Sequence, residues 1–505
     1  MATDLLADLQ ARGVTPTRLT LDSRCVEPGD VFLALPGTHV DGRAFIADAL
    51  ARGAAAVVYE PAGLASTVPP APTFAPTLAV PDLAAHAGEI AHLVYGRPSE
   101  RLWLCGVTGT NGKTSVSQWI AQAMSSFDCK CGVIGTLGNG FPPDLEVSPN
   151  TTPDAVTLHA ALARFVRAGA VACAMEVSSI GLDQGRANGL RFDVAVFTNL
   201  TRDHLEYHGS MAAYGAAKAK LFEMADCAVL NLDDPFGIEL AHRLRGRMRT
   251  IGYTLAESDD AAATDTVLRA TGLSESGAGL SFTLDGIRIA APVVGRFNAS
   301  NLLAVIGALL AGDEALDDIA AALPHLVPPA GRMQAIGGDV AQDAPLVVID
   351  YAHSPDALEK VLTTLRGTAD ARGGRLICVF GCGGDRDPGK RPQMGGVAER
   401  LADAVVLTSD NPRGEDPQAI IAAIRAGMQR PPAVEADRAK AIAAAVAAAD
   451  AQDVVLLAGK GHEPYQEVAG ERLPFSDLVQ AKSALAGRRQ AGTPPMEGRY
   501  KDSSC

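Results

Sequence analysis

The sequence contains no run of about 18 apolar residues, the length a helix needs to cross a bilayer. Its N-terminus lacks the basic segment followed by an apolar stretch that marks a secretory signal. Asp and Glu outnumber Lys and Arg by 58 to 44, and the net charge of −14 argues against binding to bulk nucleic acid or anionic membranes. We therefore expect a cytoplasmic protein with no nucleic-acid partner and no membrane insertion.

Cysteine pairs at zinc-site spacing are also missing. The nine cysteines include Cys129-x-Cys131 and Cys378-x3-Cys382, but no second pair accompanies either. Several others lie inside apolar runs, where a reduced cysteine behaves as a small hydrophobic residue. The cysteines thus indicate a reducing compartment and no zinc.

The 505 residues are too many for one hydrophobic core and predict about three domains. Apolar runs typical of buried strands alternate with helical stretches, which favours an α/β fold with mainly parallel sheets. We place the domains at residues 1–98, 99–332 and 333–490, and expect residues 491–505 to be a disordered tail.

Residues 106–114, Gly-Val-Thr-Gly-Thr-Asn-Gly-Lys-Thr, lie between a short apolar strand and an amphipathic helix over residues 115–125. Glycines there let backbone N–H groups surround phosphate oxygens at a helix N-terminus. Lys113 can reach the terminal phosphates, and the Thr114 hydroxyl can ligate Mg²⁺. Gly106 lies one residue earlier than in the usual Gly-x4-Gly-Lys spacing, so the loop is a variant. It predicts that a nucleoside triphosphate binds here.

Two strand ends supply candidate metal ligands. Glu176 ends a buried strand, and at the sheet edge facing the phosphate loop it can hold Mg²⁺ together with Thr114. Asn199, Asp203 and His204 follow the next strand, and such side chains suit metal coordination, directly or through a neighbour. On its own, a strand-end Glu is more often solvated and a single His more often structural.

Lys218 and Lys220 lie on a predicted helix over residues 211–222. A helical lysine ordinarily faces solvent. The pattern is equally compatible with a buried, modified lysine.

Three strand-end loops in the last third of the chain collect charges of both signs. Arg386 and Arg413 suit a carboxylate, because the planar guanidinium matches carboxylate geometry with two hydrogen bonds. Asp410 and Glu463 suit an ammonium group. A site with both signs predicts an amino-acid ligand, and solvated surface charge is the competing interpretation. The loops comprise residues 381–391, 410–413 and 459–463.

Taken together, these residues resemble the Mur ligases over the stretch from about Leu21 to Asp477. The motifs that carry the resemblance are Asp22-Ser-Arg24 with Pro28-Gly-Asp30, Gly109-Thr-Asn-Gly-Lys-Thr114, Asn150-Thr-Thr-Pro153, Glu176-Val-Ser-Ser179, Thr198-Asn-Leu-Thr-Arg-Asp-His204, Gly331-Arg-Met333 and Asp350-Tyr-Ala-His-Ser-Pro-Asp356.

The resemblance implies an N-terminal α/β uridine-nucleotide domain, a central P-loop ATPase with a mainly parallel sheet, and a C-terminal Rossmann-like domain. It also implies a reaction in which ATP, with Mg²⁺, converts a substrate carboxylate into an acyl phosphate that an amine then attacks. Residues 410–413, Asp-Asn-Pro-Arg, look like the signature of members that add meso-diaminopimelate to UDP-MurNAc-L-Ala-D-Glu during peptidoglycan synthesis. The family expectation is a monomer.

Site residues carry over from the family position by position. The ATP-binding set is Gly109, Thr110, Asn111, Gly112, Lys113, Thr114, Ser115, Asn298, Arg332, Asp350 and His353. The UDP-MurNAc-dipeptide set is Leu21, Ser23, His39, Val40, Asp41, Asn150, Thr151, Thr152, Ser178, Gln184 and Arg186. The diaminopimelate set is Arg386, Asp410, Asn411, Pro412, Arg413, Gly459 and Glu463. The resemblance assigns catalysis to Lys113, Glu176, His204 and Lys218. It assigns metal binding to Thr114, Glu176, His204 and, if carbamylated, Lys218.

Alternative functions stay open. The runner-up is a lysine-adding member of the family or a folylpolyglutamate synthetase, although a folate ligase would leave the N-terminal Asp-Ser-Arg unit without a nucleotide to bind. A catalytically silent nucleotide-binding scaffold would have no reason to keep all of Lys113, Thr114, Glu176, His204 and Lys218. Val107 stands where a P-loop kinase or GTPase has its first glycine, which disfavours that class. Ile180 departs from relatives, which commonly carry His there.

Overall fold

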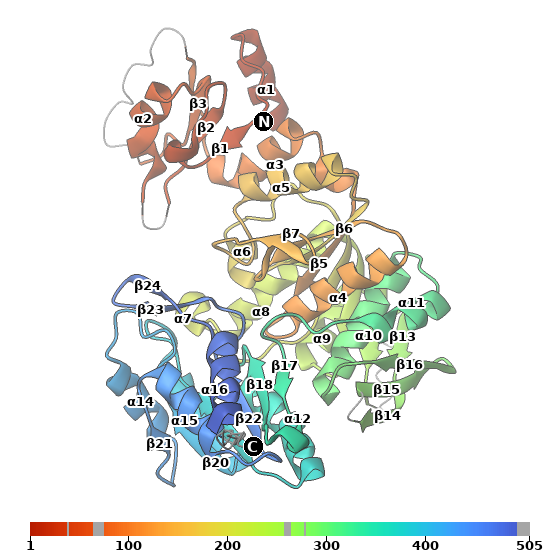
Figure 1. Ribbon diagram of the computed structural model, residues 1–505. Helices are drawn as coiled ribbons and strands as arrows, with labels where there is room; N and C mark the ends of the chain where they lie inside the picture. Colours follow the sequence, from red (N-terminus) through yellow and green to blue (C-terminus); the bar gives the residue numbers. More distant parts are fainter. Residues whose placement is uncertain (38–39, 64–74, 257–263, 277–278, 492–505) are drawn as a thin grey trace, which may run out of the picture.

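The computed structural model describes residues 1–37, 40–63, 75–256, 264–276 and 279–491. Figure 1 shows an N-terminal unit at one end, a central unit, and a C-terminal unit at the other end. Each unit combines helices with a mainly parallel sheet, so the predicted α/β class is confirmed. No helix within the described ranges is both long and apolar enough to span a bilayer. Nearly all of the predicted tail, from residue 492 on, lies outside the described residues.

The N-terminal unit is built on a four-stranded parallel sheet in the order β1-β2-β3-β4. Alternate residues of β2 enter two different cores, because successive side chains of a strand point to opposite faces. Val31 and Leu33 pack towards α1 and α3, whereas Phe32 and Ala34 pack towards α2. The elements are α1 Ala2–Ala11, β1 Leu19–Thr20, η1 Ser23–Cys25, β2 Val31–Ala34, η2 Gly42–Phe45, α2 Ile46–Ala51, β3 Ala56–Tyr59, β4 Thr77–Ala79, α3 Leu83–Val94 and η3 Pro98–Glu100.

The central unit holds a nine-stranded sheet in the order β13-β12-β11-β10-β5-β9-β6-β7-β8. All pairs from β13 to β6 are parallel, and β7 and β8 add an antiparallel edge. The strands are β5 Trp103–Thr108, β6 Cys131–Gly135, β7 Gly138–Phe141, β8 Asp144–Glu146, β9 Ala172–Glu176, β10 Phe192–Phe197, β11 Ala225–Asn231, β12 Arg249–Thr254 and β13 Thr266–Arg269. The helices are α4 Lys113–Ser126, α5 Ala155–Arg167, α6 Ser179–Asp183, α7 Leu205–His208, α8 Met211–Ala219, η4 Lys220–Met224, α9 Pro235–Leu244, α10 Arg296–Ala311, α11 Leu316–Ala322 and η6 Leu323–His325. A small antiparallel sheet of β14 Thr271–Ser276, β15 Gly279–Leu284 and β16 Ile287–Ala291 completes the unit.

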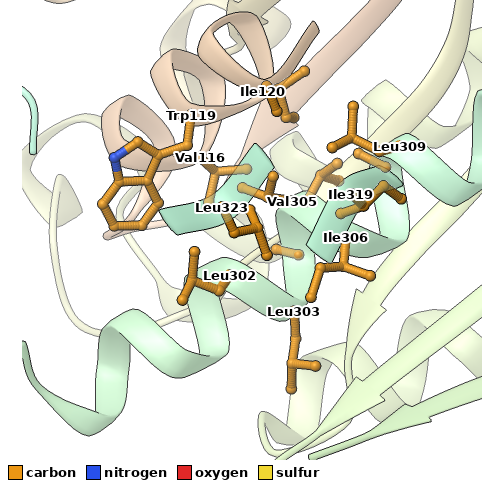
Figure 2. Close-up of a cluster of buried hydrophobic side chains, with 14 of the residues drawn as sticks. Val116, Trp119, Ile120, Leu302, Leu303, Val305, Ile306, Leu309, Ile319 and Leu323 are labelled. Carbon is orange, nitrogen blue, oxygen red and sulfur yellow. The ribbon is translucent and has the colours of Figure 1, made fainter. Parts of the chain in front are cut away.

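The core of the central unit fixes the helix that follows the phosphate loop. Figure 2 shows Val116, Trp119 and Ile120 of α4 beside aliphatic side chains of α10 and α11. Trp119 is almost fully buried, and its indole N–H donates to the Val327 carbonyl at 3.1 Å. Burial of each such side chain contributes about 1.5–3 kcal/mol. The N-terminus of α4, where the phosphate loop ends, is therefore held on a rigid core.

The C-terminal unit has a six-stranded sheet in the order β17-β18-β22-β19-β20-β21. The late strand β22 lies between β18 and β19, so the strand ends Asp350, Ala458 and Phe380 are neighbours in register. This arrangement gathers the loops after three distant strands at one edge, where open α/β sheets bind ligands. The elements are β17 Gln334–Gly337, η7 Val340–Gln342, β18 Leu346–Asp350, α12 Pro355–Arg372, β19 Leu376–Phe380, α13 Lys390–Leu401, β20 Ala404–Leu407, α14 Pro417–Arg425, β21 Ala433–Val434, α15 Arg438–Ala448, β22 Val454–Ala458, the hairpin β23 Tyr465–Val468 with β24 Glu471–Pro474, and α16 Asp477–Ala491.

Candidate active site

The phosphate loop runs from the end of β5 to the start of α4. Gly109 and Gly112 have φ values of 152° and 88°, which favour glycine, and a Cβ at Gly109 would meet the Thr198 hydroxyl. Lys113 turns back over the loop, and its Nζ donates to the Gly109 and Thr110 carbonyls at 2.8 Å each. Burial lowers the pKa of Lys113. The loop thus has a tight turn that presents backbone groups beside a lysine.

Gly106, the source of the unusual spacing, lies inside β5 and not in the loop. A Cβ there would lie 2.8 Å from the Phe192 ring and 3.1 Å from the Leu221 side chain. Gly106 therefore serves close packing of the sheet, and the phosphate-binding turn begins at Gly109.

Glu176 and Thr114 lie together, as predicted. The Thr114 hydroxyl donates to Glu176 Oε2 at 3.0 Å. Thr136 holds the same carboxylate through its backbone amide at 2.8 Å and its hydroxyl at 3.0 Å. Arg332 donates to the Thr114 hydroxyl at 3.1 Å. The sequence did not point to Thr136, although its place at the end of β6, next to β9, is the signal that could have found it.

These oxygen atoms fit a magnesium ion. A hydroxyl and a buried carboxylate are hard donors, and Mg²⁺ at nucleotide sites takes its remaining ligands from phosphates and water. Within the described residues, no group of three or more His, Cys, Asp or Glu side chains gathers as metal ligands. Among the described residues, Thr114 and Glu176 are therefore two oxygen donors that could share such an ion with phosphates and water.

Lys218 is buried, which contradicts the solvated face that is ordinary for a helical lysine. Its side chain is 1% exposed, and Nζ donates to the Gly109 carbonyl at 2.8 Å. Nζ also lies 4.4 Å from the centre of the Tyr214 ring. Burial and the charge of Lys113 hold the pKa of Lys218 well below its usual range. Lys220 differs, since it is half-exposed and ion-paired with Asp183 at 2.8 Å.

Asp203 is shared by two histidines from different units. Its Oδ2 lies 3.6 Å from Nε2 of His204 and 3.6 Å from Nε2 of His353. Burial acts to raise the pKa of Asp203, but the hydrogen bond and charge of His353, together with the charges of His204 and Lys390, lower it. His204 has a left-handed backbone, with φ 53°, which turns it towards Asp203 and Glu206. The structure thus joins His204 to the C-terminal unit.

A cavity of about 810 Å³ lies between the central and C-terminal units. Seven of the residues predicted to bind ATP line it: Asn111, Gly112, Thr114, Ser115, Asn298, Arg332 and Asp350. His353 is not among the lining residues, because it faces Asp203. Burial raises the pKa of Asp350, whose carboxylate accepts from the Met333 and Ala352 amides at 2.8 Å each.

A contact that sequence reasoning missed ties the phosphate loop to the C-terminal unit. Asp356, at the start of α12, accepts a hydrogen bond of 2.9 Å from the Asn111 side chain. Thr201 donates to the same carboxylate oxygen at 3.4 Å, and Lys360 lies 3.0 Å from it. Asp356 belongs to the motif over residues 350–356, which was the available signal.

Five of the six residues assigned to the dipeptide, all but Asn150, are linked by hydrogen bonds near the end of β9. Thr152 is fully buried, accepts from the Ser178 amide at 2.9 Å and donates to the Glu176 carbonyl at 3.0 Å. Arg186 donates to the Thr152 carbonyl at 2.8 Å and also to the Gln184 side chain. Thr151 lies 3.1 Å from the Thr136 hydroxyl, and Asn150 is exposed.

The residues assigned to the uridine nucleotide belong to the N-terminal unit. Ser23 is buried, Leu21 is half-buried, and Val40 and Asp41 are exposed. His39 lies outside the described residues.

The predicted amino-acid pocket is organised around Asn411. Its side-chain amide donates to Glu463 at 2.8 Å, and its oxygen accepts from Lys460 Nζ at 3.0 Å. Lys460 also contacts Glu463 at 3.0 Å, a partner that the sequence did not identify. Burial raises the pKa of Asp410, and a Cβ at Gly459 would meet its carboxylate. These five residues come from the loops after β20 and β22.

The two predicted arginines both lie close to Gly383. A Cβ at Gly383 would lie 2.9 Å from Arg413 Nη1 and 3.6 Å from Arg386 Cγ. Arg413 donates to the Gly384 carbonyl at 2.9 Å and lies 3.3 Å from Glu467, while Arg386 is exposed. Pro412 is buried next to Arg413. The predicted charges of both signs therefore meet at one sheet edge.

Comparisons with known proteins agree along the chain. Family models match as the "Mur ligase family, catalytic domain" at residues 16–95, the "Mur ligase middle domain" at 107–309 and the "Mur ligase, glutamate ligase domain" at 331–461. A UDP-N-acetylmuramoyl-L-alanyl-D-glutamate–2,6-diaminopimelate ligase of Ectopseudomonas mendocina is 55% identical over 484 residues, covering 94% of this chain and 96% of that protein. The ligase of the same name from Xanthomonas campestris is 51% identical, covering 97% and 98%.

Solved structures show the same relationship. A UDP-N-acetylmuramoyl-L-alanyl-D-glutamate–2,6-diaminopimelate ligase superposes with a TM-score of 0.64 at 38% identity, covering 95% of this chain and 96% of that one. A folylpolyglutamate synthase of Mycobacterium tuberculosis, at 20% identity with a TM-score of 0.60, shares the fold alone. The chain therefore belongs to the Mur ligase family.

Proposed function

We propose that this chain is an ATP-dependent amide ligase that joins meso-diaminopimelate to the D-glutamate of UDP-MurNAc-L-Ala-D-Glu in peptidoglycan precursor synthesis. The observation that carries the proposal is the position of Arg386 and Arg413 beside Gly383, in a loop that the Arg202–Asp387 ion pair of 3.1 Å ties to the central unit. The names of relatives at 51–55% identity support the choice of substrates.

The first step is activation of the D-glutamate carboxylate. A carboxylate oxygen attacks the γ-phosphorus of ATP, the bond to the bridging oxygen breaks, and ADP leaves behind an acyl phosphate. Lys113 and Arg332 place two positive charges around the transferring phosphoryl group, which stabilises its developing charge. Mg²⁺ held by Thr114 and Glu176 would supply further charge neutralisation at the phosphate oxygens. Asn298 and Asp350 line the part of the cavity assigned to the rest of the nucleotide.

Lys218 is proposed to carry a carbamate. Its lowered pKa favours the neutral amine, whose nitrogen can bond to the carbon of CO2 with release of a proton. The product is an anion placed under the phosphate loop, near His204 through Tyr214. A carbamate carbon signal from protein equilibrated with ¹³C-bicarbonate, absent in Lys218→Met, is the expected NMR result.

The dipeptide substrate is proposed to extend from the N-terminal unit to the phosphate loop. Leu21, Ser23 and Asp41 would contact the uridine end. Thr152 contacts the Glu176 carbonyl at the end of β9, the Ser178 amide and the Arg186 side chain. Arg186 is a cation suited to binding a carboxylate. This network would aim the D-glutamate carboxylate at the γ-phosphate.

Arg413 is proposed to bind the second amino-acid end of meso-diaminopimelate, which carries both a carboxylate and an ammonium group. A carboxylate there can receive two hydrogen bonds from a guanidinium, whereas lysine has no carboxylate at that end. Asp410 and Glu463 provide negative charge for the ammonium group. Arg413→Ala should therefore raise the KM for the amino-acid substrate and leave the KM for ATP nearly unchanged.

The remaining assignments are proposals of the same kind. We place the domain boundaries at 1–98, 99–332 and 333–490, and propose a cytoplasmic monomer. The eight cysteines that the structure describes are free thiols, which supports a reducing compartment. Light scattering at working concentration tests the oligomeric state.

Phosphate release tests the function directly. The protein should release phosphate from ATP only when UDP-MurNAc-L-Ala-D-Glu and meso-diaminopimelate are both present. Omission of either substrate provides the control. Absence of release with any amino acid would contradict the proposed activity and favour a nucleotide-binding scaffold.

A further inference from the structure

His462 lies between the two halves of the site. It follows β22 in the turn that also carries Lys460 and Glu463 of the amino-acid pocket. Its ring packs on Tyr351 with 5.4 Å between ring centres and an angle of 39°. A Cβ at Gly331 would meet the His462 backbone nitrogen, so the turn is held tightly against the linker between the units.

The other side of His462 faces the phosphate site. Its ring lies at the Thr136 backbone, a contact that acts to raise the His462 pKa. Thr136 in turn holds the Glu176 carboxylate through two hydrogen bonds. Arg332, which contacts Thr114, lies 4.6 Å from the centre of the Tyr351 ring. His462 therefore lies between Lys460 and Glu463 of the amino-acid pocket and the residues that contact Glu176 and Thr114.

One ring nitrogen of His462 is unused. Nδ1 is buried and has no hydrogen-bond partner among the residues that the structure describes. Buried polar atoms are usually hydrogen-bonded, so an unpartnered one calls for an explanation. In the tautomer that carries the proton on Nε2, the Nδ1 lone pair is free to accept a proton.

The imidazole is neutral at neutral pH. Burial, and next the charge of Arg332, lower the pKa of His462 to about 4, although Glu463 and the Thr136 contact act to raise it. The charged and titratable groups that face it are Arg332, Lys460, Glu463 and Tyr351.

Building on the proposed function, we propose that His462 is a catalytic base whose Nδ1 accepts the proton of the incoming amine as it attacks the acyl phosphate. The amine nitrogen forms a bond to the acyl carbon. The bond between that carbon and the bridging phosphate oxygen breaks, and its electrons leave with inorganic phosphate. The N–H proton passes to Nδ1. A weak base suffices, because a nitrogen that is becoming an amide is strongly acidic.

Hydroxylamine separates this role from a structural one. It is largely unprotonated at neutral pH and traps acyl phosphates as hydroxamates without a base. His462→Gln and His462→Asn would be compared with wild type using ATP, the dipeptide substrate, and either meso-diaminopimelate or hydroxylamine. The exposed His242→Gln serves as the matched control.

The expected result is a fall of about 10²-fold or more in kcat with meso-diaminopimelate, with hydroxamate formation changed less than about threefold. The ratio of the two rates within each variant does not depend on the fraction folded. An equal fall in both rates, or no fall in either, would overturn the proposal for His462. Failure of the wild-type protein to form hydroxamate would instead overturn the proposed ligase activity.

Discussion

Lys218 Nζ donates a 2.8 Å hydrogen bond to the carbonyl of Gly109, the first residue of the phosphate-binding turn. This contact puts a buried lysine directly under the loop that we propose to bind the nucleotide phosphates. Burial disfavours its ammonium form, so we expect Lys218 to lower the stability of the fold.

Lys218→Met should abolish activity and stabilise the protein. We expect kcat to fall at least about 10²-fold, because no anion can then form under the loop. Melting in CO2-free buffer at pH 7.5 should occur a few degrees higher, since about 1 kcal/mol corresponds to about 2–4 °C for a domain of this size. Lys220→Met, two residues further along but half-exposed, is the matched control and should change both quantities little. Retention of full activity by Lys218→Met would contradict a role for the lysine.

His159 should make stability depend on pH. It lies on α5 beside α3, with Nε2 3.1 Å from the Asn188 carbonyl, and burial lowers its pKa from 6.5 to about 4. Between these values the unfolded chain binds a proton that the folded chain does not, so the free energy of unfolding falls as pH drops from 6.5 to about 4. The loss is at most about 3 kcal/mol.

Urea unfolding at pH 7.5 and pH 4.5 checks this prediction. His159→Gln should lose less stability between the two values than wild type, with a residual loss that includes His462, whose pKa is also about 4. The exposed His242→Gln should follow wild type. Identical pH slopes in wild type and His159→Gln would show that His159 does not titrate in this way.

Glu176→Gln should weaken the dependence on magnesium. The amide keeps the shape of the side chain but removes the negative charge of the carboxylate, whose oxygens accept hydrogen bonds from Thr114 and Thr136. We expect kcat to fall by about 10²–10³ and the half-saturating Mg²⁺ concentration to rise, because carboxylate oxygen is the preferred donor for this ion. A magnesium titration at saturating ATP measures both. An unchanged half-saturation would exclude Glu176 as a ligand.

Arg413→Ala should raise the KM for meso-diaminopimelate strongly while the KM for ATP stays within about twofold. Loss of a charge-assisted, bidentate contact corresponds to about 2–5 kcal/mol, or roughly 30-fold to several thousandfold. Arg472→Ala, whose guanidinium lies over the Tyr465 ring in the neighbouring hairpin, is the matched control. If Arg413→Ala lost ATP binding instead, the assignment of Arg413 to the amino-acid pocket would be wrong.

Much of the fold was predictable because buried parallel strands read as continuous apolar runs that end in polar loops. Residues 346–350, 376–380 and 454–458 are such runs, and each is a strand with these bounds. Their spatial order was not predictable. The insertion of β22 between β18 and β19 depends on packing over the whole unit, and it decides which loops meet.

The candidate site shows the same division. Glu176 and Thr114 could be paired from the sequence, because Glu176 ends one buried strand and Thr114 comes after the loop that follows another, and both strand ends lie at one sheet edge. Asp356 could not be paired with Asn111, because 245 residues separate them and the contact depends on how two units close. Lys218 was unpredictable from its helix, since the phosphate loop that covers it comes from an earlier part of the chain.

The central claim is tested most directly by competition between amino acids. The protein is incubated with ATP, Mg²⁺, UDP-MurNAc-L-Ala-D-Glu and equal concentrations of meso-diaminopimelate and L-lysine, and the product is identified by mass spectrometry. We expect a UDP-MurNAc-tripeptide that carries diaminopimelate, in large excess over the lysine product. A lysine-containing product in equal or greater amount would contradict it.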